Sequence, residues 1–115
     1  MAAIVERDDV TGYDTLVYTN NGTTASWDSG TASTTQAAEI AYGFCTTFDT
    51  AATFSAGTNW DSVTGTGLSF GNVSSADGDS VFLEARTLSS TGGYNATGTS
   101  NSSVATESLI ATWKT

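Results

Sequence analysis

The sequence predicts an all-β domain, an antiparallel β-sandwich of the jelly-roll or immunoglobulin-like type with short strands and long loops rich in Gly, Ser and Thr. Three observations predict this fold. Thr and Ser together make up 37 of the 115 residues, and the branched Cβ of Thr suits a pleated sheet. Leu, Glu, Lys, Gln and Arg, which favour helices, are sparse. Turn signals recur about every 8–12 residues, as in sandwiches and barrels.

The length is that of one domain. We expect a single β-sandwich over residues 12–115, preceded by an N-terminal arm over residues 1–11. The arm has too few apolar residues to fold by itself, so it is expected to become ordered on a partner.

The first expected strand covers residues 15–19 and ends at Asn20-Asn21-Gly22. Because Asn and Gly tolerate positive φ, this segment predicts a tight turn, with residues 24–27 as the hairpin partner. Asp28-Ser29-Gly30 is expected to close that hairpin.

Alternation is clear in two later segments. Residues 37–48 place Ile40, Tyr42 and Phe44 on one face and predict a strand, although residues 35–41 could instead form a short helical turn. Residues 80–88 form the best strand, with Val81, Leu83 and Ala85 on one side and Glu84 and Arg86 on the other. Weaker strands and turns are expected at residues 50–54, 56–59, 60–63, 68–73 and 76–79.

The last part of the chain is expected to contain a long exposed loop over residues 89–102 and a final strand over residues 104–113. Neither face of that strand is wholly apolar. An edge or interface position is therefore expected for it.

The net charge of −9 limits the possible partners. Only Arg7, Arg86 and Lys114 could contact phosphate, which excludes a nucleic-acid partner, and an anionic membrane surface would repel the chain. No run approaches the ~20 apolar residues of a membrane span, and no signal peptide is visible. We therefore expect a protein made in the cytoplasm, or a chain whose leader is missing.

The residue types argue against an enzyme. His is absent, Lys114 is the one lysine, and Cys45 is the one cysteine, so a catalytic triad has few components. Cys45 lies in an apolar run and is expected to be buried and inert. No cofactor is expected. Asp77 and Asp79, with Asn72 and Glu84, could offer oxygen ligands to Ca²⁺, but an Asp-Gly hairpin turn explains the same residues without a metal.

Aromatic residues suggest a second class of function. Trp27 and Phe82 are expected in the core, whereas Trp60 and Tyr94 lie in loop-like settings and could stack on sugar rings. This is the physical case for a carbohydrate-binding or adhesin module.

The start Met1-Ala2-Ala3-Ile4, the Gly/Ser/Thr-rich strands and the final strand over residues 107–113 resemble small virion structural proteins of tailed bacteriophages, in particular capsid decoration or cement proteins. The resemblance implies a β-rich homo-oligomer, often a trimer, that is made in the host cytoplasm and clamps capsid subunits on the virion surface. No residue role is carried over from it. The alternatives are the carbohydrate-binding or adhesin module and an extracellular filament subunit assembled by strand addition.

Under this reading the partners are protein subunits of the same assembly, either further copies of the chain or a capsid protein. The residues expected to bind them are apolar or aromatic residues of the arm and the loops, with one cation: Ile4, Val5, Arg7, Trp60, Tyr94 and Trp113.

Deleting residues 1–11 is expected to weaken or abolish attachment to the partner, because the apolar side chains of the arm would no longer be buried there. The β-sheet circular dichroism signal should stay largely unchanged. Attachment at the wild-type level would remove the arm from the interface, and loss of the sheet signal would assign it to the core.

Overall fold

The computed structural model describes residues 11–49, 52–62, 73–74 and 80–115, which form nine β-strands and no helix. Two strands are much longer than the others, β1 (Gly12–Asp28) and β9 (Thr97–Lys114). The remaining strands are β2 (Ala32–Ser33), β3 (Glu39–Thr47), β4 (Phe54–Ala56), β5 (Asp61–Ser62), β6 (Val73–Ser74), β7 (Ser80–Leu88) and β8 (Gly93–Tyr94).

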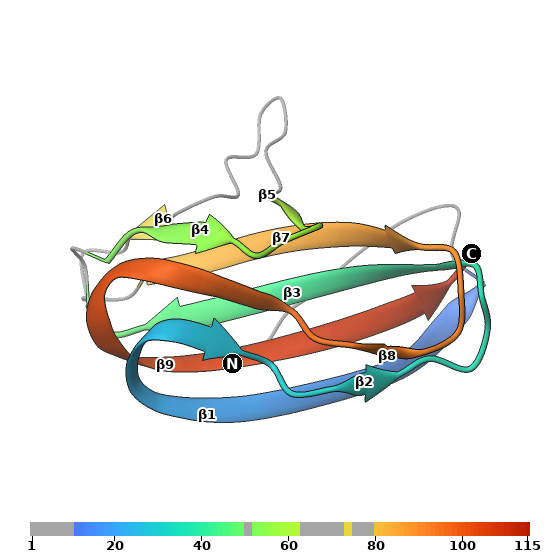
Figure 1. Cartoon of the computed structure of the whole chain (residues 1–115), viewed down its shortest axis with the longest axis horizontal. Coiled ribbons are helices and arrows are strands. Elements are labelled where there is room, and N and C mark those ends of the chain that lie inside the picture. Colours follow the sequence, from blue (N-terminus) through green and yellow to red (C-terminus); the bar gives the residue numbers. More distant parts are fainter. Residues whose placement is uncertain (1–10, 50–51, 63–72, 75–79) are drawn as a thin grey trace.

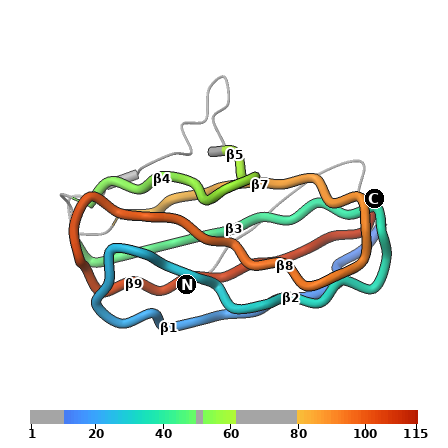
Figure 2. Tube along the Cα trace, in the orientation of Figure 1, coloured from blue at the N-terminus to red at the C-terminus, as the bar shows by residue number. Residues whose placement is uncertain are grey.

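The main sheet has the strand order β1-β9-β3-β7-β5, with β4 paired to β9 and β6 paired to β7. Figure 1 shows both long strands curving at the same end of the molecule, so that the second half of β1 and the first half of β9 lie in front of the other halves of these strands. The trace in Figure 2 follows the same course. One layer therefore contains the first half of β1, the second half of β9, β3 and β7, and we call it layer A.

The second layer, layer B, contains the end of β1 with β2, the start of β9 with β8, and β4. Its β1 and β9 segments pair at Ser26↔Thr99 and Asp28↔Thr97, and Ala32↔Tyr94 continues that pairing. In immunoglobulin-like sandwiches the first strand lies beside the second. Here it lies beside the last, so the antiparallel sandwich predicted from the sequence takes the jelly-roll order.

The expected hairpin over residues 15–27 is wrong, because these residues form one continuous strand. Both halves of β1 pair with β9 rather than with each other. The register shifts three times, between Tyr13 and Thr15, between Asn20 and Gly22, and between Thr24 and Ser26. Gly22 does have the predicted positive φ of 65°, and Asn20 Oδ1 accepts its N–H. The Asn-Gly segment therefore forms a bulge within the strand instead of reversing it.

The expected loop over residues 89–102 is also wrong in part. Only residues 89–92 and 95–96 lie outside strands there, since β8 and the start of β9 occupy the rest. Thr is a good strand residue, so the polar composition concealed a strand. The strands expected at 37–48 and 80–88 are confirmed as β3 and β7, and residues 35–38 form bends rather than a helical turn.

The core lies between the two layers. Trp27 and Phe82, both predicted to be core residues, are fully buried and pack edge to face with ring centroids 6.2 Å apart. Phe54 and Ile110 belong to the same cluster, and so does Cys45, which is free and buried as expected. Burial raises the pKa of the Cys45 thiol to about 12. Residues 1–10 of the expected arm, most of the segment over residues 68–73 and the turn over residues 76–79 lie outside the described residues.

Replacing Cys45 by Ser is expected to lower the free energy of unfolding by roughly 1–2 kcal/mol, because a hydroxyl would enter an apolar cluster. Urea denaturation measures this loss, and the oligomeric state should be unchanged. Rapid labelling of the native thiol by a disulfide reagent would contradict the burial on which the expectation depends.

Candidate interface and groove

The outward side of layer A is the more apolar of its two sides. Residues paired across antiparallel strands share a face and alternate along each strand, so the register of β1, β9, β3 and β7 defines four rows of four residues. Twelve of these sixteen positions are apolar or aromatic, and the rest are Asn20, Thr46, Thr87 and Glu107. We call the twelve the apolar face: Tyr13, Leu16, Tyr18, Ile40, Tyr42, Phe44, Val81, Leu83, Ala85, Leu109, Ala111 and Trp113.

Exposure is concentrated along β1, which is the edge strand of the sheet. Tyr13, Leu16 and Tyr18 are 58, 49 and 50% exposed. Trp113 lies beside them, with its ring edge to face with Tyr13 at 6.3 Å and with Tyr42 at 5.7 Å. A hydrogen bond between Tyr18 and Glu107 raises the pKa of the tyrosine. A line of half-exposed aromatic and aliphatic groups thus follows the edge strand and borders a packed aromatic cluster.

The inward side of layer A is unusually polar. Glu39, Glu84, Ser108 and Thr112 are fully buried there. Glu84 extends between the layers, and its Oε2 accepts the N–H of Gly57 at 3.2 Å. Gly43 leaves the space for this side chain, since a Cβ at that position would lie 2.9 Å from Glu84 and 2.5 Å from the Ala96 Cβ. Burial raises the pKa of Glu84 to about 8, so the group is held in its neutral form at neutral pH.

A cluster of polar groups joins the first and last strands at one end of the sandwich. Lys114 Nζ lies 3.1 Å from Asp14 Oδ1. The hydroxyl and the backbone N–H of Thr35 both donate to the Asp14 carboxylate. These hydrogen bonds, the Thr35 hydroxyl first, hold the pKa of Asp14 well below its usual range. The arrangement is an ion pair with hydrogen-bond support, and it ties β1 to β9 and to the segment before β3.

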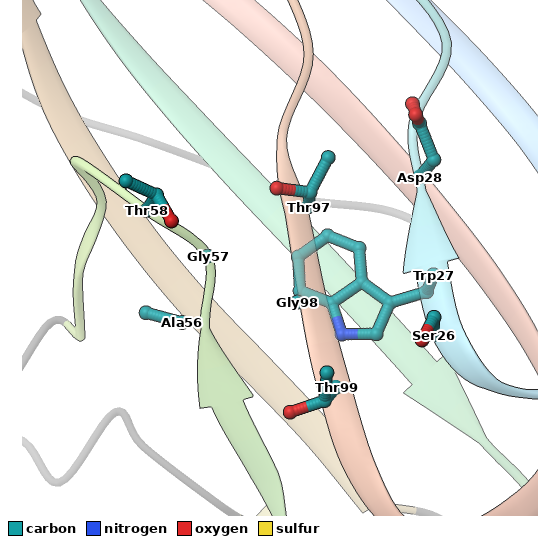
Figure 3. Close-up of a pocket in the computed structure, with 9 residues that line it drawn as sticks. All are labelled: Ser26, Trp27, Asp28, Ala56, Gly57, Thr58, Thr97, Gly98 and Thr99. Carbon is teal, nitrogen blue, oxygen red and sulfur yellow. The ribbon is translucent and has the colours of Figure 1, made fainter.

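The outward side of layer B is covered by short polar side chains. Ser26, Asp28, Ser55, Thr97 and Thr99 point outward from neighbouring segments of β1, β4 and β9. Between them lies a groove of about 450 Å³, lined by Ser26, Trp27, Asp28, Ala56, Gly57, Thr58, Thr97, Gly98 and Thr99 (Figure 3). A Cβ on Gly98 would lie 2.4 Å from the Ser55 carbonyl oxygen and 2.6 Å from the Trp27 ring. Glycine at this position lets the indole pack flat beneath the strand.

The structure places the predicted partner-binding residues apart. Trp113 lies on the apolar face. Trp60 is 6% exposed and its Nε1 donates to the Asn95 carbonyl oxygen, so it is a core residue and has no exposed ring to stack on a ligand. Tyr94 is half-buried, with Arg86 5.2 Å above its ring. Ile4, Val5 and Arg7 lie outside the described residues. Glu84, considered above as a Ca²⁺ ligand, is buried between the layers, while Asn72, Asp77 and Asp79 are not described.

The residues that sequence reasoning missed are Tyr13, Leu16 and Tyr18. Leu16 and Tyr18 alternate in the sequence, and this alternation predicts a strand over residues 15–19. The information that the sequence lacked is which side of the strand faces the second layer. The described residues contain no helix that is long and apolar enough to cross a membrane, and no group of three or more metal-ligating side chains was found among them.

The raised pKa of Glu84 predicts a stability that falls as pH rises. Between about pH 4.5 and about pH 8 the carboxyl ionises in the unfolded chain but stays protonated in the fold, so the folded state binds more protons. The free energy of unfolding should fall across this window by about 2–4 kcal/mol. Chemical denaturation at several pH values measures it.

The variant Glu84→Gln should flatten that pH profile, because an amide keeps the acceptor for Gly57 and does not ionise. The matched variant Glu107→Gln, on the outer side of the sheet, should retain the wild-type slope. An unchanged slope in Glu84→Gln would show that another group causes the pH dependence.

The chain was also compared with known proteins. No protein-family model, no curated protein and no solved structure matches it. The function is therefore argued from the geometry of the apolar face and the groove.

Proposed function

We propose that the chain is a non-enzymatic structural protein whose copies bind one another in a larger assembly, of the kind that decorates the surface of a virion. The observation that carries this proposal is the apolar face of layer A. In a monomeric sandwich the inward side of a sheet is expected to be apolar and the outward side polar. Here the outward side is the more apolar one, and a protein partner would remove its exposed groups, Tyr13, Leu16, Tyr18 and Val81, from water.

The size of the face limits the strength of one subunit contact. Four strands about 4.8 Å apart and four rows about 6.8 Å apart cover roughly 500 Å², and only part of this area is open to solvent, because Ile40, Leu83, Leu109 and Ala111 are already buried. Stable pairwise interfaces bury about 800 Å² per partner. One such contact is therefore modest, and many copies in an assembly would strengthen attachment through multivalency. Tyr and Trp, which recur on this face, are enriched in protein interfaces.

Charge favours a second copy of the chain as the partner. The chain carries 12 acidic and 3 basic residues. A basic partner would be expected to bind at a surface where several of these acidic groups lie. The sixteen positions of the outward side include one carboxylate, Glu107, and no cation. Two copies of a strongly acidic chain can therefore approach through this face with little repulsion. The virion setting rests on the resemblance described above, and a carbohydrate-binding module is the other class of function considered.

The variant Leu16→Glu is expected to dissociate the assembly, weakening self-association by at least about 30-fold, because it places a charge at the centre of the exposed line on β1. Its circular dichroism spectrum should match the wild type, since Leu16 is half exposed. Sedimentation equilibrium of the purified full chain measures the association constant.

The matched control is Ser55→Glu, which adds the same charge on the outward side of layer B and should associate as the wild type does. A wild-type chain that stays monomeric at about 1 mM, the range of very weak contacts, would contradict the proposal. Equal loss of association in both variants would assign the effect to net charge rather than to the apolar face.

A further inference from the structure

We propose that the groove of layer B is a binding site for a neutral ligand rich in hydroxyl groups, of the saccharide class. The site goes beyond the proposed assembly function, because it lies on the opposite layer from the apolar face. It also differs from the carbohydrate site that the sequence suggests, since it contains neither Trp60 nor Tyr94.

The lining of the groove sets the chemistry of the ligand. Its side chains offer the hydroxyls of Ser26, Thr58, Thr97 and Thr99 and the carboxylate of Asp28, with no cation among them. Hydroxyls donate and accept, whereas a carboxylate accepts from ligand O–H groups with the strength of a charge-assisted hydrogen bond. A phosphate, a sulfate or an acidic sugar would meet Asp28 without a compensating charge. The volume of about 450 Å³ lies within the range of small-molecule sites.

The wall formed by Asp28 is held in place before any ligand binds. Both carboxylate oxygens of Asp28 accept from Asn95 Nδ2, at 2.8 and 3.1 Å. Oδ1 also accepts the N–H of Gly30 at 2.8 Å. Asp28 keeps further lone pairs for a ligand hydroxyl, because an ionised carboxylate accepts about four hydrogen bonds.

The opposite wall, formed by the turn after β4, is held by Asn95 and by Glu84 from between the layers. The turn after β4 is anchored where Trp60 Nε1 donates to the Asn95 carbonyl oxygen at 3.0 Å, and Trp60 N donates to Gly57 O. Glu84 accepts the N–H of Gly57 from beneath the sheet. Asn95 thus links both walls, so a ligand would bind with little ordering of the protein, which favours affinity.

The floor of the groove contains an unused hydrogen-bond donor. Trp27 is 2% exposed and packs under Gly98, and its Nε1–H has no acceptor within the described residues. Figure 3 shows the nitrogen edge of the ring on the side of Ser26 and Thr99, which line the groove. Buried indole N–H groups are normally hydrogen bonded. An acceptor oxygen of a ligand seated between these two side chains would satisfy it.

The test uses the indole resonances of the three tryptophans of the ¹⁵N-labelled full chain. Cellotriose, maltotriose, tri-N-acetylchitotriose and lactose are each titrated to about 20 mM, which saturates a site of millimolar affinity. At least one should move the Trp27 Nε1–H cross-peak in a saturable way. Trp60, bonded to Asn95, and Trp113, on the apolar face, should change little. Sialyllactose, the acidic counterpart of lactose, should move the Trp27 peak less than lactose does.

Two variants separate the groove from non-specific binding. Thr99→Arg fills the groove from an exposed position and should weaken the sugar that binds wild type by at least about tenfold. Thr53→Arg, which places the same group at an exposed position outside the groove, should bind as the wild type does. No movement of the Trp27 peak with any neutral sugar, or binding that survives Thr99→Arg, would overturn the proposal. Self-association, measured by sedimentation equilibrium, tests the assembly proposal separately and does not depend on the result of the sugar titrations.

Discussion

The pairing of the first strand with the last is the constraint on which the rest of the structure depends. The ladder runs from Gly12↔Lys114 to Asp28↔Thr97, so it passes through both layers. The other strands build on this ladder, since β3 and β4 pair with β9, β7 pairs with β3, and β5 and β6 pair with β7. Such long-range pairing carries a high cost in loop entropy. The ion pair between Asp14 and Lys114 stabilises the end of this ladder, where the start of β1 meets the end of β9.

The reversed polarity of layer A explains why the buried interior includes so many hydrogen-bonding groups. Glu39 Oε2, Thr106 Oγ1 and Thr112 Oγ1 are buried without a partner among the described residues, and each such atom costs free energy. Meanwhile large aromatic groups remain on the outside, where they contribute less to the stability of the isolated domain than they would in its core. The interior is thus less stabilising than one filled with aliphatic side chains. Burying the outward aromatic groups against a neighbour would offset part of that cost.

Much of the fold could be predicted from the sequence, because alternation determines which residues share a side of a strand. The pattern in residues 80–88 separates Val81 and Leu83 from Glu84 correctly. Alternation cannot show which of the two sides faces the second layer. Hydrophobicity predicts that the more apolar side faces it, whereas in this structure the less apolar side does. The groove was not predictable either, because its walls come from segments around residues 28, 57 and 97 that only the long-range pairing brings together. Gly98 looked like a loop residue, although it is a strand residue over the Trp27 ring.

The three register shifts in β1 have a consequence for how copies of the chain could grow into larger structures. An edge strand with an even ladder can accept a further strand from another molecule, and repetition of that step produces fibres. Two of these shifts, between Tyr13 and Thr15 and between Asn20 and Gly22, place an extra residue in β1 and interrupt the spacing of its free N–H and C=O groups. A straight added strand would therefore lose its alignment after a few residues. Association of copies through the side chains of the apolar face does not need such alignment of backbone groups. Among the described residues, the geometry of β1 therefore disfavours filament growth by strand addition at this edge.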